Sequence, residues 1–92
     1  MALPQVSREA LIDAMGRFDV TRRAAYNFAA NRYVIQFADQ LYPPKEIISI
    51  ATGRGVDTFS GGKAGANAYL VRRGFTVVDL AEVGRDALGL AS

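Results

Sequence analysis

The spacing of apolar residues changes from helical to alternating along this 92-residue chain, and this change limits the folds open to it. Helical spacing joins the apolar residues of the first stretch: Ala10, Leu11, Ala14, Met15 and Phe18. Over 33–37, Tyr33, Ile35 and Phe37 alternate with other residues and would share one face of a strand. A chain that carries both periods is expected to pack helices against a sheet.

Two helical stretches are predicted before residue 31. The first starts at Ser7, whose hydroxyl can accept hydrogen bonds from the free N–H groups of the first turn. Glu9 suits the positive end of this helix, and Gly16 is a candidate end. A second, alanine-rich helix is expected at about 21–30.

A β-hairpin is predicted at about 33–42, with its turn at 38–40. Pro43 and Pro44 end its second strand, and Pro44 suits the first turn of a helix because it lacks the N–H that would stay unpaired there. This helix is expected to run to about Thr52, with Gly53 as its C-terminal cap.

The second half of the chain predicts a polar loop at 53–62, a helix at about 62–73 and a closing strand at 75–80. Residues 81–92 are expected to form a weak terminal helix or a frayed tail. The predicted fold is therefore a single α+β domain, 1–92, with the order α-α-β-β-α-α-β. Its small antiparallel sheet consists of the hairpin and the closing strand, packed against the helices.

The composition excludes several kinds of site. The chain has no histidine and no cysteine, so the usual zinc ligands, the commonest general base and any disulfide are missing. No window reaches eighteen apolar residues, and the N-terminus does not read as a secretory signal. We therefore expect a cytoplasmic, non-enzymatic domain with no cofactor, no metal and no membrane contact.

The charge is compatible with a nucleic-acid partner but does not require one. Eleven Lys and Arg residues face nine Asp and Glu residues, giving a formal charge of +2 and an isoelectric point of about 9.3. Ten of the eleven cations lie at or before Arg73, so the body of the domain is more basic than its C-terminal end.

Lys45 is the first candidate anion ligand. A double proline places it in the first turn of a helix, where the dipole is positive and a lysine is slightly unfavourable. Together with free N–H groups it could hold a phosphate. The plainer interpretation is a solvated lysine after a prolyl turn. A pairing with Ser49 one helical turn later, as in a Ser–Lys catalytic pair, lacks an oxyanion hole.

The segment 59–63, Phe-Ser-Gly-Gly-Lys, is the second candidate. Its glycines allow close backbone approach to a phosphate, Ser60 could cap the next helix or contact the phosphate, and Lys63 adds charge. It fails the P-loop pattern because Ala64 follows the lysine and no strand leads into it. A serine cap with a flexible glycine entry explains the segment equally well.

Two further side chains are candidates for DNA contacts. Arg32 stands beside the aromatic Tyr33 at a strand edge, and Asn67 carries an amide that could read a base edge. Arg72 and Arg73, by contrast, fall at the end of a predicted helix, where cations are favoured for structural reasons.

Several of these segments together resemble a known family. They are Tyr42-Pro43-Pro44-Lys45, Phe59-Ser60-Gly61-Gly62, Asn67, Leu70, Gly74-Phe75 and Val77-Val78. This combination, over roughly 32–80, resembles the N-terminal head domain of ScoMcrA-like, modification-dependent (type IV, HNH-containing) restriction endonucleases. In that family the head precedes DNA-recognising modules and an HNH nuclease domain. The resemblance thus implies a detached domain of a defence nuclease, with the nuclease domains of a larger protein as further partners.

The resemblance also implies which residues meet DNA. It carries this role to Tyr42, Lys45, Ser60, Gly61, Gly62, Lys63 and Asn67. The two lysines would hold phosphates, the backbone of 60–62 would brace one, Tyr42 would stack on a base and Asn67 would read a base edge. With Arg32, these residues form the predicted DNA-binding set.

Three functions remain open from the sequence. The first is a DNA-binding accessory domain of a restriction enzyme, with double-stranded DNA as partner and modified DNA as a candidate target. The second is a protein-interaction or dimerisation module of such an enzyme, for which Val20, Val56 and the 81–90 tail are the candidate surface. The third, a phosphate- or nucleotide-binding regulator, depends on the glycine loop alone.

Overall fold

The computed structural model describes residues 4–28, 31–62 and 65–84. Its helices are α1 (Arg8–Thr21), α2 (Pro44–Thr52), α3 (Ala66–Val71) and α4 (Leu80–Val83), and its strands are β1 (Tyr33–Phe37), β2 (Gln40–Tyr42) and β3 (Thr76–Asp79). Single 3₁₀ turns follow α1 at Arg23–Ala25 and α2 at Val56–Thr58. The predicted α+β class is confirmed.

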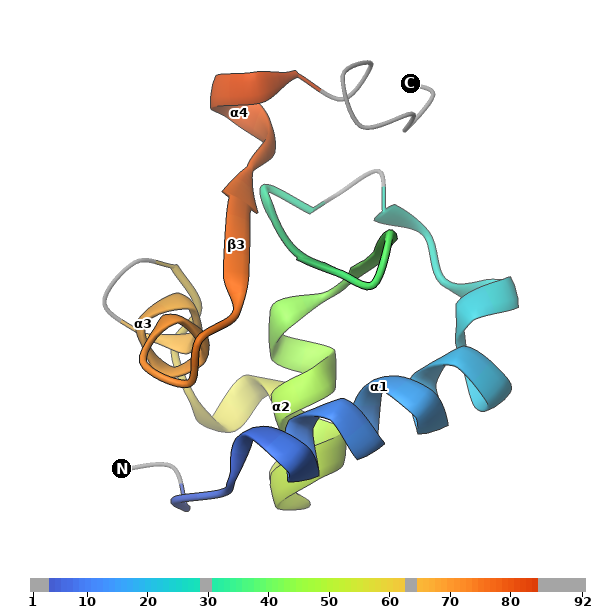
Figure 1. Ribbon diagram of the computed structural model, residues 1–92, viewed down its shortest axis with the longest axis vertical. Helices are drawn as coiled ribbons and strands as arrows, with labels where there is room; N and C mark the ends of the chain where they lie inside the picture. The colour runs from blue at the N-terminus through green and yellow to red at the C-terminus, as the bar shows by residue number, and fades with distance from the viewer. Residues whose placement is uncertain (1–3, 29–30, 63–64, 85–92) are drawn as a thin grey trace.

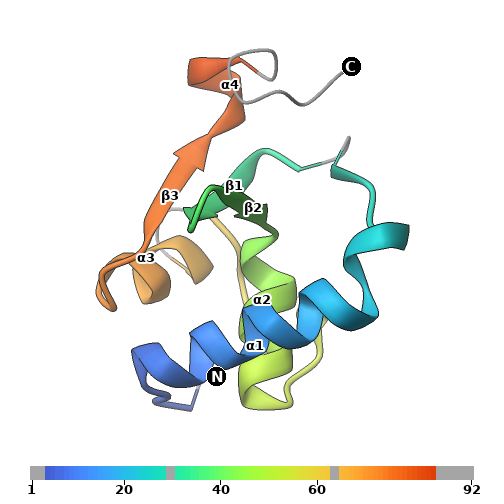
Figure 2. The same cartoon turned by 45° about the vertical axis from the view of Figure 1, so that its right-hand side comes forward.

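The sheet is antiparallel throughout, with β1 in the centre of the order β2-β1-β3. Ile35 stands opposite Tyr42 on β2 and opposite Val77 on β3. The hairpin and the closing strand therefore pair as the alternation predicts. In Figure 2 the sheet lies above α1, α2 and α3, and Figure 1 shows β3 leading from α3 to α4.

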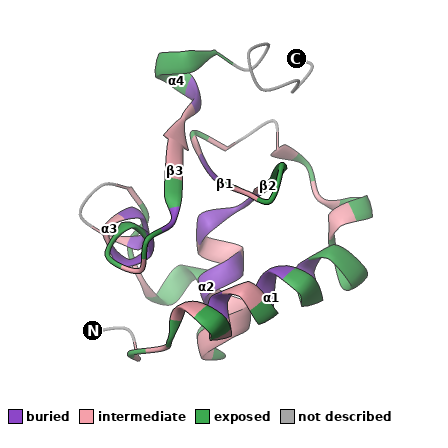
Figure 3. Cartoon of the chain, in the orientation of Figure 1, coloured by how far each residue is buried: buried purple, intermediate pink, exposed green. Residues whose placement is uncertain are grey.

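The core lies between the sheet and these three helices. α1 crosses α2, and the buried stripe of each faces inward (Figure 3). The side chains that α1 buries are Leu11, Ala14, Met15 and Phe18, and α2 buries Ile47 and Ile48. The sheet adds Ile35, and α3 adds Ala66, Tyr69 and Leu70. One continuous apolar cluster thus fixes α2 and α3 against β1.

The first helix is longer than the sequence predicts. Ser7 caps it as expected, by accepting a hydrogen bond of 3.1 Å from the Ala10 N–H. Gly16, however, lies inside α1, which runs to Thr21, and the second helix expected at about 21–30 is shorter, with a 3₁₀ turn at Arg23–Ala25 in the described part of that stretch. The apolar stripe continues through Gly16 to the buried Phe18, and this burial outweighs the helix cost of one glycine, about 1 kcal/mol.

Replacing Gly16 by Ala is expected to raise the free energy of unfolding by about 0.5–1 kcal/mol. A Cβ at this position would meet nothing within 4 Å, and the position is exposed on the helix surface. The gain would come from the lower entropy of the unfolded chain. Urea unfolding followed by circular dichroism measures it, and a loss of stability would contradict the helical assignment of this position.

The hairpin turn consists of Ala38 and Asp39, both with positive φ, 52° and 62°. Phe37 pairs with Gln40 across it, so the loop holds two residues and Gln40 belongs to β2 rather than to the predicted turn. Two positive φ angles in a two-residue hairpin loop define a turn in which glycine or asparagine is usual. An alanine there keeps the hairpin at some conformational cost.

The second half follows the prediction with shifted boundaries. α2 begins at Pro44 and ends at Thr52, and Gly53, with φ of 76°, forms the expected left-handed cap. α3 begins at Ala66, four residues later than predicted, because the chain first turns through Gly62 and Gly65. β3 leads directly into the short helix α4. The remainder of the predicted tail, 85–92, lies outside the described residues.

Candidate nucleic-acid interface

The first turns of α2 and α3 meet at an open cleft of about 340 Å³. Its lining includes Pro44, Lys45, Gly61, Gly62, Ala66 and Asn67. Arg32 and Tyr33 bound it from the start of β1. Two segments that lie apart in the sequence thus line one cleft: 43–46 and, among the described residues, 61–62 with 66–67.

A second cleft, of about 450 Å³, adjoins the first. Tyr33 and Asn67 line both clefts, and Arg72, Val71, Val77 and Asp79 line only the second. The two hollows therefore share a wall made by one aromatic ring and one amide. We refer to the first as the α2 cleft and to the second as the β3 cleft.

Lys45 presents a cation to the α2 cleft without a carboxylate partner among the described residues. Its Nζ lies 5.4 Å from the centre of the Phe59 ring, and its stem rests against Gly61, where an added Cβ would come within 3.2 Å of Lys45 Cδ. The ammonium thus lies over the ring, the stem passes Gly61, and no carboxylate of the described residues neutralises the charge.

The start of α2 has no side-chain cap. Pro43 and Pro44 carry no N–H, and Ile47 donates to the Pro43 carbonyl at 3.1 Å. The N–H groups of Lys45 and Glu46 are therefore the free donors of the first turn. Lys45 and Glu46 both line the cleft, so a positive charge and backbone donors come from the same turn.

The loop before α3 is held by its own carbonyls. Ala66 donates to the Ser60 carbonyl at 3.0 Å, and Asn67 donates to the Gly62 carbonyl at 3.1 Å. Gly62 has φ of 80°, which favours glycine, and a Cβ on Gly65 would collide with the Ser60 carbonyl oxygen. The fold therefore requires glycine at 65, a position that the sequence did not single out, because the need arises only when the loop closes.

Asn67 is the one buried polar side chain among the described residues, at 6% exposure. Its backbone belongs to the first turn of α3, and its side chain lines both clefts. No hydrogen bond to its side-chain amide occurs within the described residues, and no fully enclosed side-chain polar atom there lacks a partner. The amide therefore opens onto the clefts rather than being lost in the core.

Arg32 reaches the rim of the α2 cleft but is already paired. Its Nε and one terminal nitrogen donate to the two oxygens of Asp79 at 3.3 and 3.2 Å. The hydrogen bond with Asp79 and the charge of that carboxylate raise the pKa of Arg32. Its side chain is 62% exposed, yet its charge is largely matched by Asp79. Its charge is therefore less available to a DNA phosphate than the sequence suggests.

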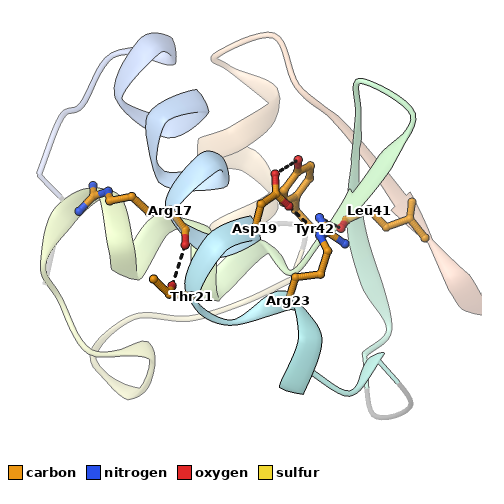
Figure 4. A network of polar contacts seen from close by, with 6 residues as sticks. All are labelled: Arg17, Asp19, Thr21, Arg23, Leu41 and Tyr42. Carbon is orange, nitrogen blue, oxygen red and sulfur yellow. Dashed lines mark hydrogen bonds and ion pairs between the residues drawn. The ribbon is translucent and has the colours of Figure 1, made fainter.

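Tyr42 cannot stack on a base in this structure, and the role predicted for it is wrong. Its side chain is only 4% exposed and belongs to the core. The hydroxyl donates to Asp19 at 2.9 Å, and Arg23 lies over the ring at 4.6 Å (Figure 4). Strand alternation points Tyr42 inward beside Phe18, so it fixes β2 to the end of α1.

Tyr42 is expected to make the free energy of unfolding depend on pH. Burial, followed by the hydrogen bond to Asp19, raises its pKa above the ordinary value of 10.0. Its contribution to stability is therefore complete below about pH 10 and is lost as the pH rises through the higher folded-state pKa. Tyr42→Phe should lower the free energy of unfolding by about 1 kcal/mol near neutral pH and reduce its alkaline decline. Urea unfolding at about pH 8 and about pH 11 tests this; an unchanged alkaline decline would contradict it.

Most other arginines have structural partners. Arg17 and Arg23 form ion pairs one helical turn apart, with Asp13 and Asp19, and Arg22 pairs with Glu46. Arg8 and Arg73 hold backbone carbonyls, and Arg73 also stacks over Tyr69 at 3.6 Å. The sequence suggested a helix-end role for both Arg72 and Arg73. Arg72 does stand at this helix end, as the C-cap of α3, and it is exposed at the β3 cleft with no ion pair among the described residues.

The remaining candidate residues belong to α2 and to the glycine loop before α3. Ser60 is exposed and does not cap α3, since Gly65 occupies the cap position with no side-chain bond. Lys63 lies outside the described residues. Ser49 donates to the Arg54 carbonyl at 2.6 Å, so its hydroxyl is engaged away from Lys45 and the Ser–Lys pair is not formed. Gly61 and Gly62 line the cleft as expected.

Two further features bear on the kind of protein this is. Within the described ranges, no three acidic side chains gather into a group that could hold a metal ion. None of the helices in those ranges is long and apolar enough to cross a membrane. The fold and its clefts thus define a small α+β domain whose marked surface feature is a pair of adjoining hollows with a cation and a buried amide.

The chain belongs to the family of ScoMcrA-like N-terminal head domains. The family model matches residues 4–79, which is well over half of the chain. The match begins at the N-terminal segment rather than near residue 32, so α1 is part of the shared domain. The family places the chain in a restriction-enzyme context and fits an accessory domain. Neither the curated proteins nor the solved structures gave a match.

Proposed function

We propose that this head domain binds double-stranded DNA as a non-catalytic accessory domain of a restriction enzyme. The observation that carries the proposal is the α2 cleft, which is lined by Lys45, by the uncapped first turn of α2 and by Asn67, whose amide has no partner among the described residues. Phosphate binding by the cation and the backbone would position the domain, and the amide could distinguish bases.

The charges around the clefts favour an anionic ligand once ion pairs are taken into account. Glu46 is engaged by Arg22 at 2.7 Å, and Asp79 by Arg32. Glu82 is the remaining acid at the clefts, and Lys45 and Arg72 are the cations without an ionic partner within the described ranges. The excess is modest, so the affinity should come from a few phosphate contacts and should fall with salt.

Modified DNA is the target that the family context favours. A modified base differs from an ordinary one at its edge, and Asn67 is the described polar side chain placed to meet such an edge. The proposal therefore extends to a preference for modified over unmodified duplexes, with the amide of Asn67 as the discriminating group.

Binding of the domain to short duplexes, unmodified and cytosine-modified, tests the function across about 50 to 200 mM salt. Fluorescence anisotropy should show binding that weakens steeply with salt, with a log–log slope of about −2 to −4 for a few neutralised phosphates. Equal binding of both duplexes would reject only the proposed preference for modified DNA. Absence of binding at the lowest salt would reject DNA as the ligand of the isolated domain.

The alternative, a docking or dimerisation module, has less support from the surface. The exposed large apolar side chains of the described residues are Val20, Val56, Val71 and Val83. They belong to four different elements, and none forms a patch with the others through a shared helix or strand. Single exposed valines are ordinary on a protein surface.

A further inference from the structure

We propose that the α2 cleft takes a single unpaired nucleotide, whose base lies against Tyr33 and hydrogen-bonds to Asn67 while its phosphate meets Lys45. This inference rests on the proposed function, since it names the part of DNA that the cleft accepts. The nucleotide can come from a single strand or from a base extruded from a duplex, and the chemistry of recognition is the same for both.

Asn67 is buried although its side chain is polar. Its side-chain amide has no protein partner in the described ranges, although the residue is only 6% exposed and lines both clefts. Only a group that enters the cleft can reach such an amide. A carboxamide presents a donor and an acceptor side by side, which matches the paired donor and acceptor on the edge of a nucleobase.

A base that stays stacked in a duplex cannot enter a cleft of this kind. Its edges are reachable only through the grooves, by side chains that project outward. Asn67 does not project outward, because it lies in the first turn of α3 and is only 6% exposed at the wall of the cleft. Enzymes and readers that bring such recessed groups to a base take the base out of the stack. The recessed amide therefore points to an unpaired base.

Tyr33 supplies the surface on which the base can rest. Its side chain is half-buried, lines both clefts and has Arg32 at 5.2 Å from the ring centre. Base–aromatic stacking is worth about 1–3 kcal/mol per base in single-strand binding proteins. Tyr33 thus takes the stacking role that the sequence gave to Tyr42.

The phosphate site completes the fit. Lys45 and the free N–H groups of the first turn of α2 line the same cleft as Tyr33 and Asn67. A volume of about 340 Å³ lies in the range of pockets that hold small ligands. One nucleotide would therefore place its base and its phosphate on different, chemically matched walls.

The test compares three DNA ligands of one sequence: a fully paired duplex, the same duplex with a single bulged base, and the single strand. The protein is the full chain with Asn67→Leu, which keeps the size of the side chain and removes its hydrogen bonds. Gln36→Leu is the matched control, because Gln36 is exposed on β1 and lines neither cleft.

We expect the wild-type chain and Gln36→Leu to bind the bulged duplex or the single strand about tenfold more tightly than the paired duplex, equivalent to about 1.4 kcal/mol. Tighter binding of the bulged duplex identifies an extruded base, and tighter binding of the single strand identifies single-stranded DNA. Asn67→Leu should lose this preference and bind the three ligands with similar affinity.

Equal binding of all three ligands by the wild-type chain overturns the inference and leaves DNA binding intact. A preference that survives in folded Asn67→Leu overturns the role of the amide. If circular dichroism shows that Asn67→Leu is unfolded, Asn67→Asp replaces it and should change which base in the bulge is preferred. Failure to bind any of the ligands would reject the proposed function itself.

Discussion

Replacing Lys45 by Met is expected to weaken binding to a short DNA duplex about five- to tenfold at 100 mM salt. The substitution keeps an unbranched side chain beside Gly61 and removes the charge that lies over the Phe59 ring. Because Lys45 would neutralise one phosphate, the slope of log affinity against log salt should become shallower by about 0.9. Fluorescence anisotropy over the salt series measures both effects.

Arg17→Met is the matched control for this change, since it also removes one positive charge. Arg17 lies on α1, pairs with Asp13 and lines neither cleft. Its loss should alter affinity less than about twofold, as expected from net charge alone. If both substitutions weakened binding equally, DNA would be attracted by the overall charge and the assignment of Lys45 to a phosphate would be contradicted.

Replacing Gly65 by Ala is expected to lower the free energy of unfolding by about 2–3 kcal/mol and to reduce DNA affinity. The new methyl would collide with the Ser60 carbonyl, and the atom in its way belongs to backbone rather than to a flexible side chain. Ser60 also accepts the hydrogen bond from Ala66 that closes the loop. To relieve the collision, the loop must open and move Gly61 and Gly62 away from Lys45.

Gly16→Ala is the matched comparison, because it should change the free energy of unfolding in the opposite direction. The chemical change is identical, but a methyl at Gly16 meets nothing and should stabilise the chain. Urea unfolding of both variants separates a local collision from a general effect of alanine. Equal stabilisation by the two substitutions would show that the loop is not closed in the way described.

The fold follows from the sequence because its signals are local and agree with one another. The alternation at 33–37, the prolines before α2 and the Ser7 cap each predict a feature that the structure contains. Gly16 does not end the first helix, because buried residues continue the helix on both sides of it. The late start of α3 depends on a backbone turn at Gly65, which no single residue of the sequence predicts.

The candidate site could be predicted only in part. Lys45 and Asn67 stood out as a cation at a helix start and an amide near a glycine loop, and the structure brings them to one cleft. Whether an aromatic ring faces that cleft depends on strand register, which buries Tyr42 and leaves Tyr33 at the wall. The sequence could not show that the charge of Arg32 is already paired. Its partner, Asp79, is distant in sequence and reaches it only through the pairing of β1 with β3.

The position of the bound DNA tests the account most directly. Amide chemical shifts of the ¹⁵N-labelled chain would be followed by NMR as a short duplex with one bulged base is added. We expect the largest shift changes at the backbone amides of Lys45 and Asn67 and of the cleft glycines Gly61 and Gly62, with little change along α1. Changes concentrated at Val20 or elsewhere on α1, with the cleft unaffected, would contradict it.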